Sequence, residues 1–155
     1  KMASAMVRGV QSRSVAATVK HFACNNKETN RKNSDSRLSQ RALREIYLRA
    51  FEIIVREAQP WAIMSSYNII NGRRASESRE LLTDILRAEW GYTGMVMTDW
   101  WTRGEHYKEL LAGNDLKMAN GYPERVREAM DQGAVKRTDL ETCARRVLAL
   151  ILKID

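Results

Sequence analysis

Polar and aromatic side chains that could take part in chemistry follow three apolar segments, each at the point where the segment ends. They are Lys20 and His21 after the first segment, Tyr67 after the second, and Asp99 with Trp100 after the third. If the three segments are neighbouring parallel strands, their carboxyl ends share the sheet edge at which ligands bind. We therefore expect a cation, an imidazole, a phenol, a carboxylate and an indole to converge on one pocket.

Each of these residues also has a purely structural interpretation, which the sequence leaves open. Asp99 could cap a following helix, and His21 could be a core histidine whose hydrogen bonds are satisfied. Lys20 could extend to solvent. Tyr67 could be buried with its hydroxyl bonded to backbone, and Trp100 could serve packing alone.

Strand and helix patterns alternate along the chain. Helical spacing of apolar residues is strongest at 38–58, where Ser39 is the expected N-cap. Strands are expected at 15–22, 61–67, 94–100 and 115–119, and further helices at 77–90, 104–112, 123–133 and 138–152.

Four such βα units predict an α/β fold with a parallel sheet. They could form a small open sheet with helices on both faces. They could also form half of a (β/α)₈ barrel, because a complete barrel needs about 250 residues. The 155 residues contain no recognisable linker, so we expect one domain spanning 1–155.

Composition narrows the functional classes. The net charge of +7 comes from 26 basic and 19 acidic residues, but the basic residues are dispersed over helices. We expect a solvated basic surface and no nucleic-acid partner. No apolar run is long enough to span a membrane, no signal peptide is recognised, and the compartment stays open.

Cysteine and motif content exclude several chemistries. Cys24 and Cys143 are far apart and fit neither a disulfide framework nor a metal-binding spacing, so both are expected in the core. The sequence contains no nucleophile elbow, no glycine-rich phosphate loop and no paired-histidine metal signature. We therefore expect neither a metal nor another cofactor.

Three longer stretches resemble family 3 glycoside hydrolases of the β-glucosidase branch. They are "GVQSRSVAATVKHFACNNKETNR", "REIYLRAFEIIVREAQPWAIMSSYNIING" and "LLTDILRAEWGYTGMVMTDW". The resemblance runs from about residue 7 to the end of the chain, and its motifs occur in the family's order and spacing. It implies a TIM-type barrel for the catalytic domain.

The resemblance also implies a role for each residue at the strand ends. Asp99 would be the nucleophile of a retaining hydrolase that acts on a β-glucoside or a short β-linked oligosaccharide. Lys20 and His21 would bind sugar hydroxyls in the −1 subsite. The remaining implied site residues are Met64 and Tyr67 near that subsite and Trp100 in the next subsite. A lysine within ~4–6 Å of Asp99 would favour its charged form.

The sequence departs from the family pattern in several ways. We expect the chain to be the C-terminal half of the barrel domain, completed in cis or in trans by the other half. A separate sandwich domain usually supplies the acid/base glutamate in this branch, and it is absent from the chain. Residues Ser76–Ser78 stand where the family often has asparagine, and Lys117 and Ala119 could alter the rim of the pocket.

Two functional interpretations follow. The chain could contribute the nucleophile and part of the −1 subsite to a working glycosidase. Alternatively, it could be a non-catalytic half-barrel that binds a sugar or a partner protein. The missing acid/base favours the second interpretation for the isolated chain, whereas the retention of all strand-end residues favours the first.

Overall fold

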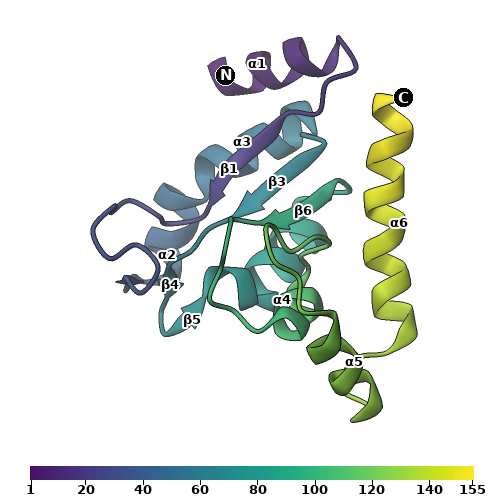
Figure 1. Cartoon of the computed structure of the whole chain (residues 1–155). Coiled ribbons are helices and arrows are strands. Elements are labelled where there is room, and N and C mark those ends of the chain that lie inside the picture. The colour runs from purple at the N-terminus through teal and green to yellow at the C-terminus, as the bar shows by residue number, and fades with distance from the viewer.

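A computed structural model describes all residues from 1 to 155 and places a parallel three-stranded sheet at the centre (Figure 1). The strand order is β1 (Thr18–Phe22), β3 (Ala62–Ser65) and β6 (Met95–Thr98). Ala62 pairs with Met95 and Ser65 with Thr98, so the carboxyl ends of the strands lie at one edge. The chain is therefore a partial TIM-type α/β fold, as expected.

The predicted fourth strand at 115–119 is reduced to a single bridge between Met97 and Leu116. Lys117 turns its side chain into the interior, where only 2% of it is exposed. Ala119 then adopts a left-handed backbone conformation with φ of 70°. The segment 115–119 therefore does not form the predicted strand, and the fourth βα unit contributes a single bridge to the sheet.

The helix predicted at 38–58 divides into three consecutive segments. They are α2 (Gln40–Ala42), the π-helical η1 (Leu43–Tyr47) and α3 (Arg49–Ala58). Ser39 caps the first segment by accepting a hydrogen bond from the Ala42 N–H, as predicted. In η1 the Leu48 N–H bonds to the Leu43 carbonyl five residues earlier, and both leucines are buried in the core.

The remaining helices follow the predicted order with shifted boundaries. The predicted 77–90 helix is a short 3₁₀ turn followed by a π-helix, and the large apolar residues of the π-helix are buried. Gly91 follows it with φ of 71°. The segments are α1 (Met2–Gln11), η2 (Ala75–Glu77), η3 (Glu80–Glu89), α4 (His106–Ala112), α5 (Pro123–Asp131) and α6 (Arg137–Ile154).

A second, smaller sheet lies in the connections at the carboxyl edge. Its strands are β2 (Asp35–Ser36), β4 (Ile69–Ile70) and β5 (Arg73–Arg74). β2 pairs with β4 in parallel, and β4 pairs with β5 in antiparallel orientation. The loop after β1 is thus joined to the loop after β3, which fixes the position of both loops beside the strand ends.

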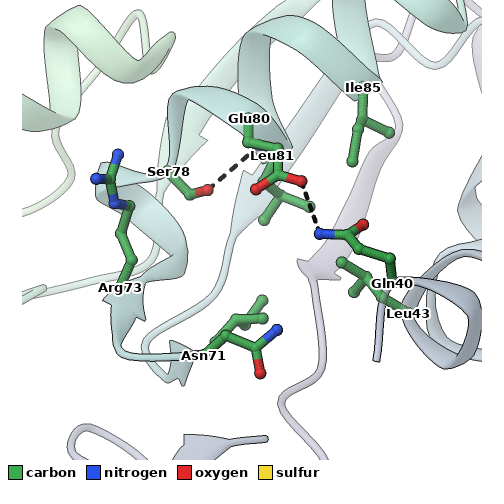
Figure 2. A pocket seen from close by; sticks show the side chains of 9 residues that line it. Gln40, Leu43, Asn71, Arg73, Ser78, Glu80, Leu81 and Ile85 are labelled. Carbon is green, nitrogen blue, oxygen red and sulfur yellow. Dashed lines mark hydrogen bonds between the residues drawn. The ribbon is translucent and has the colours of Figure 1, made fainter. Parts of the chain in front are cut away.

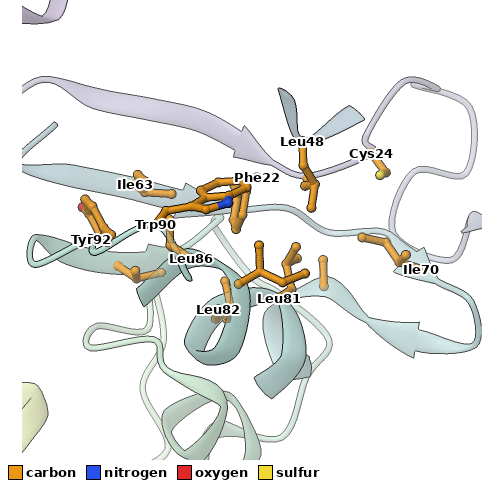
Figure 3. Packing of buried hydrophobic residues seen from close by; sticks show 14 of the residues in the cluster. Phe22, Cys24, Leu48, Ile63, Ile70, Leu81, Leu82, Leu86, Trp90 and Tyr92 are labelled. Carbon is orange, nitrogen blue, oxygen red and sulfur yellow. The ribbon is translucent and has the colours of Figure 1, made fainter. Parts of the chain in front are cut away.

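The main core lies between the central sheet and the helices α3 and η3. Phe22, at the end of β1, packs edge-on against Phe51 and Trp90, with ring centroids 5.0 and 5.9 Å apart. Figure 3 shows leucines of η3 meeting the same cluster. Burial of these side chains stabilises the fold by roughly 1.5–3 kcal/mol each.

The two terminal helices expose apolar residues. Met2 and Met6 of α1 are largely exposed, and so are Leu148 and Leu152 of α6. The apolar residues of α6 are therefore covered only near its N-terminal part, around Cys143. Both cysteines are buried and free, and burial raises the pKa of each to about 11. No helix of the chain has the length and apolar character needed to cross a membrane.

Candidate active site

The structure brings the ends of all three central strands together through backbone hydrogen bonds. Beyond the regular ladder, the Ser66 N–H donates to the Phe22 carbonyl at 2.8 Å, and the Asp99 N–H donates to the Ser65 carbonyl at 3.1 Å. These bonds fix the direction in which the chain leaves each strand. The side chains that follow are thereby presented on one edge of the sheet.

Asp99 is 6% exposed, and its two carboxylate oxygens have different surroundings. Oδ1 accepts a hydrogen bond from the Trp100 N–H at 2.7 Å. Oδ2 is buried without a hydrogen-bond partner. No helix begins here, since α4 starts only at His106, so the helix-capping interpretation of Asp99 was wrong.

His21 places its imidazole beside the free oxygen of Asp99. Its Nε2 is 3.5 Å from Oδ2, which is longer than an ordinary hydrogen bond. Burial lowers the pKa of His21; Asp99 opposes this shift, and Lys20 and Arg31 add to it. The imidazole is therefore neutral near pH 7 and carries one N–H donor. With 28% of its side chain exposed, His21 is not a core residue.

Lys20 and His21 differ in exposure at the end of β1, where the pairing with β3 is irregular between Val19 and Phe22. Exposure alternates along this strand, with Thr18 and Lys20 exposed and Val19 and His21 partly buried. The lysine is exposed and forms no ion pair with Asp99. Of Lys20 and His21, only His21 therefore contacts the carboxylate of Asp99.

Tyr67 is buried, and its hydroxyl donates to the Trp100 carbonyl at 2.5 Å. Burial raises the pKa of the phenol, and the nearby charge of Asp99 raises it further. The sequence pattern did not reveal that two cations flank the ring. Arg31 lies 4.9 Å and Lys32 5.0 Å from its centroid, because the polar loop after β1 folds back over Tyr67.

Met64 and Trp100 border the same edge with opposite exposure. Met64 is buried on β3, beside Met97 in register. Trp100 is 44% exposed and Trp101 is 57% exposed, and their ring centroids lie 5.5 Å apart. Beside this loop a cavity of about 320 Å³ is lined in part by Trp101 and Tyr122.

A separate cavity of about 320 Å³ lies between α2, η1 and η3, and it contains none of the residues predicted for the site (Figure 2). Gln40 and Glu80 meet across it in a 2.8 Å hydrogen bond. Its lining mixes leucines with Arg73 and Asn71, and no group of three or more metal-binding side chains occurs anywhere in the chain. The strand-end cluster is therefore the better candidate for chemistry.

Comparison with known proteins relates this geometry to a family. Residues 1–150 match the model of the glycosyl hydrolase family 3 N terminal domain. β-Glucosidase A of Butyrivibrio fibrisolvens is 64% identical over 141 residues, which are 91% of this chain and 17% of that protein. An exo-α-(1->6)-L-arabinopyranosidase of Bifidobacterium longum is 46% identical over 96% of this chain and 20% of its own length.

Solved structures agree with these relatives. β-Glucosidase 3B from Thermotoga neapolitana, in complex with α-D-glucose, superposes with a TM-score of 0.94 at 42% identity. The match covers 98% of this chain and 23% of that one. A family 3 β-glucosidase of Bifidobacterium adolescentis gives a TM-score of 0.93 at 45% identity, covering 97% of this chain and 23% of that one. The chain thus spans about a fifth of the length of the relatives it matches.

The family match corrects one expectation. The matching model describes the N-terminal domain of the family, so the description of the chain as a C-terminal half was wrong. The βα units of a barrel repeat the same local pattern, and their number alone does not fix where a segment belongs. The chain belongs to glycosyl hydrolase family 3, and residues 1–150 match its N-terminal domain.

Proposed function

We propose that this chain supplies Asp99 as the nucleophile of a retaining glycosidase that removes terminal β-D-glucosyl residues. The observation that carries the proposal is the buried Oδ2 of Asp99, which has no hydrogen-bond partner at the carboxyl end of β6. The Trp100 N–H holds the other oxygen. One oxygen is thus oriented while the other remains available to attack an anomeric carbon.

The neighbouring residues suit the −1 subsite that surrounds such a nucleophile. His21, neutral near pH 7, can donate Nε2–H to a sugar hydroxyl beside Asp99. The exposed Lys20 can donate to another hydroxyl when its side chain turns toward the sugar. Tyr67 stays protonated and braces the Trp100 backbone, while Met64 offers an apolar wall.

The reaction proposed for this site is a double displacement. Asp99 bonds to the anomeric carbon as the glycosidic bond breaks, and an acid ~5–5.5 Å away protonates the leaving oxygen. Water then releases the sugar from Asp99. We propose that a sandwich domain outside the chain supplies this acid. We also propose that residues 1–155 are one partial domain, which the remaining barrel strands complete in cis or in trans.

The choice of sugar rests on the relatives. Several of them are named β-glucosidases, and the Thermotoga neapolitana enzyme was solved with glucose. The Bifidobacterium longum relative is named for an arabinopyranoside instead. Glucose is therefore the proposed glycone, and an α-L-arabinopyranoside is the alternative to be measured beside it.

The test uses a chimera in which this chain replaces the matching segment of β-glucosidase A from Butyrivibrio fibrisolvens. The chimera is incubated with 2-deoxy-2-fluoro-β-D-glucosyl fluoride, whose glycosyl-enzyme hydrolyses slowly, and is examined by intact-mass spectrometry and peptide mapping. We expect one adduct on Asp99. Asp99→Asn should remove the adduct, while Asp131→Asn, at an exposed surface position, should retain it.

A folded chimera that hydrolyses aryl glucosides but carries its adduct on another residue would overturn the assignment of Asp99. A folded chimera with neither activity nor adduct would favour the non-catalytic interpretation. Folding is judged by a thermal midpoint close to that of the parent enzyme. The same labelling of the isolated chain reports whether it assembles a −1 subsite without its partners.

A further inference from the structure

Lys117 is a buried cation with every donor occupied. Its Nζ donates to the Thr102 hydroxyl at 2.9 Å, to the Gly104 carbonyl at 3.2 Å and to the Glu109 carboxylate. Only 2% of the lysine side chain and 1% of the Glu109 side chain are exposed. Gly104 sits so close that a Cβ there would collide with the Glu109 carboxylate. The lysine is therefore part of a tightly enclosed polar cluster.

This cluster extends to the backbone of Asp99. The second Glu109 oxygen accepts from the Ser76 hydroxyl at 2.8 Å. The Asn114 amide donates to the carbonyls of Ser76 and Glu109, and its oxygen accepts from the Ser65 hydroxyl at 2.8 Å. The Ser65 carbonyl in turn accepts from the Asp99 N–H. A continuous set of hydrogen bonds thus links the ion pair to the end of β6.

The segment that carries Lys117 also holds the loop after β6 on both sides of Asp99. On the near side, the Met118 N–H donates to the Thr98 hydroxyl at 3.0 Å. On the far side, Lys117 holds Thr102 and the backbone that follows it. The tryptophans at 100 and 101 lie between these two attachments. Their position therefore depends on the same short segment.

Stability alone does not explain this arrangement. A buried ion pair loses hydration that its mutual attraction often only balances, and an apolar pair of similar volume is frequently as stable. The pair instead fixes the conformation of the loop, because an ammonium group with three fixed acceptors allows only one loop geometry. We propose that Lys117 is a positioning residue that holds the 99–104 loop, and with it the indole of Trp100, which the family resemblance places in the subsite next to the −1 subsite. This proposal rests on the proposed function.

The test compares kcat/KM for two substrates in the chimera. Lys117→Met combined with Glu109→Gln removes both charges and keeps a group that can accept from Ser76. We expect kcat/KM for β-D-glucosyl fluoride, which has no aglycone ring, to stay within about threefold. For aryl β-glucosides we expect kcat/KM to fall by about tenfold or more, mainly because KM rises. This is the size of effect expected when one fixed contact is lost.

Thr102→Val provides a second variant in case the double variant does not fold. It removes one acceptor of Lys117 without disturbing the ion pair, and volume changes little. We again expect a larger loss of kcat/KM for aryl β-glucosides than for β-D-glucosyl fluoride, with a smaller difference between the two substrates. Equal losses on both substrates in either folded variant would show a merely structural role and overturn the proposal, and so would unchanged kinetics on both.

A readout that needs no catalysis separates this inference from the assignment of Asp99. Amide hydrogen exchange of the chain should quicken across 99–104 in both variants and remain unchanged in β1. The chimera variants could show faster amide exchange in the 99–104 loop although the chimera forms no adduct at Asp99. That result would support the positioning role of Lys117 and contradict the assignment of Asp99 as nucleophile. If the amides of the 99–104 loop are as protected in the variants as in the parent, the positioning role of Lys117 is contradicted, whatever the labelling shows.

Discussion

Nε2 of His21 lies 3.5 Å from Oδ2 of Asp99, although 77 intervening residues separate the two positions in sequence. The contact exists because β1 and β6 flank β3 in one parallel sheet, and their carboxyl ends therefore meet. The distance is too long for a strong hydrogen bond. A sugar hydroxyl between the two groups would satisfy both.

His21→Phe is expected to lower kcat/KM of the chimera on p-nitrophenyl β-D-glucoside by about 10–100-fold, because a hydrogen bond to a charged or reacting group contributes about 1.5–3 kcal/mol. The loss should appear in kcat as well as in KM if the bond strengthens in the transition state. The other histidine supplies the control, since His106→Gln should leave kcat unchanged. Equal activity of His21→Phe and the unmodified chimera would remove His21 from the proposed subsite.

Trp100→Ala is expected to raise KM by about tenfold for aryl glucosides, because an exposed indole offers a stacking surface worth about 0.5–1.5 kcal/mol beyond its buried area. β-D-Glucosyl fluoride has no ring to stack and serves as the internal control. Steady-state kinetics over several aglycones measures the effect. A KM that is the same for every aglycone in the variant and the parent would argue against this role.

Several parts of this arrangement could be predicted from the sequence. Apolar runs such as Met95–Met97 predicted the strands, and the helical spacing around Leu43 and Ile54 predicted a long helix beside them. The convergence of His21, Tyr67 and Asp99 followed from the rule that parallel strands share one edge. Local pattern suffices here because each feature depends on residues close in sequence.

Other parts depend on contacts between distant segments and escaped prediction. The segment predicted as the fourth strand makes a single bridge to β6, and its Lys117 pairs inward with Glu109, a contact that no local pattern specifies. The ring of Tyr67 is flanked by Arg31 and Lys32 only because a polar loop folds back over it. The sequence flagged Lys117 at the pocket rim, whereas its charge lies buried beneath the loop.

Removal of the Asp115 carboxylate is expected to destabilise the junction of β6 and α6. Its buried carboxylate accepts from Arg87 at 2.8 Å, from Arg146 at 2.9 Å and from the Val96 N–H at 2.8 Å. Asp115→Ala leaves the Arg87 guanidinium buried without its partner, which costs about 3–5 kcal/mol. For a chain of this size the thermal midpoint should fall by roughly 6–20 °C.

Glu45→Gln is the matched control for that prediction. It breaks the pair between Arg41 and Glu45, whose side chains are both mostly exposed. Exposed pairs contribute little, so the midpoint should hardly move. Differential scanning calorimetry of the two variants compares them directly. Similar midpoints for Asp115→Ala and Glu45→Gln would show that the buried carboxylate does not carry the stability assigned to it.

Stability should fall on acidification through a pH range set by the histidines. Burial lowers the pKa of His106, Lys117 lowers it further, and Nδ1 accepts from the Tyr122 N–H at 3.0 Å. The unfolded chain therefore binds a proton more readily than the folded chain. The stabilisation is complete above the ordinary pKa of about 6.5 and is lost as the pH falls through the lowered value.

His21 contributes with the same sign, since its pKa is also lowered. The thermal midpoint should be level above about pH 7 and decline toward pH 5.5, before carboxylates begin to titrate. His106→Gln keeps an oxygen that can accept from the Tyr122 N–H and has no proton to gain, so its midpoint should decline less over this interval. A decline as steep in His106→Gln as in the parent chain would mean that His106 is not the residue that links folding to pH.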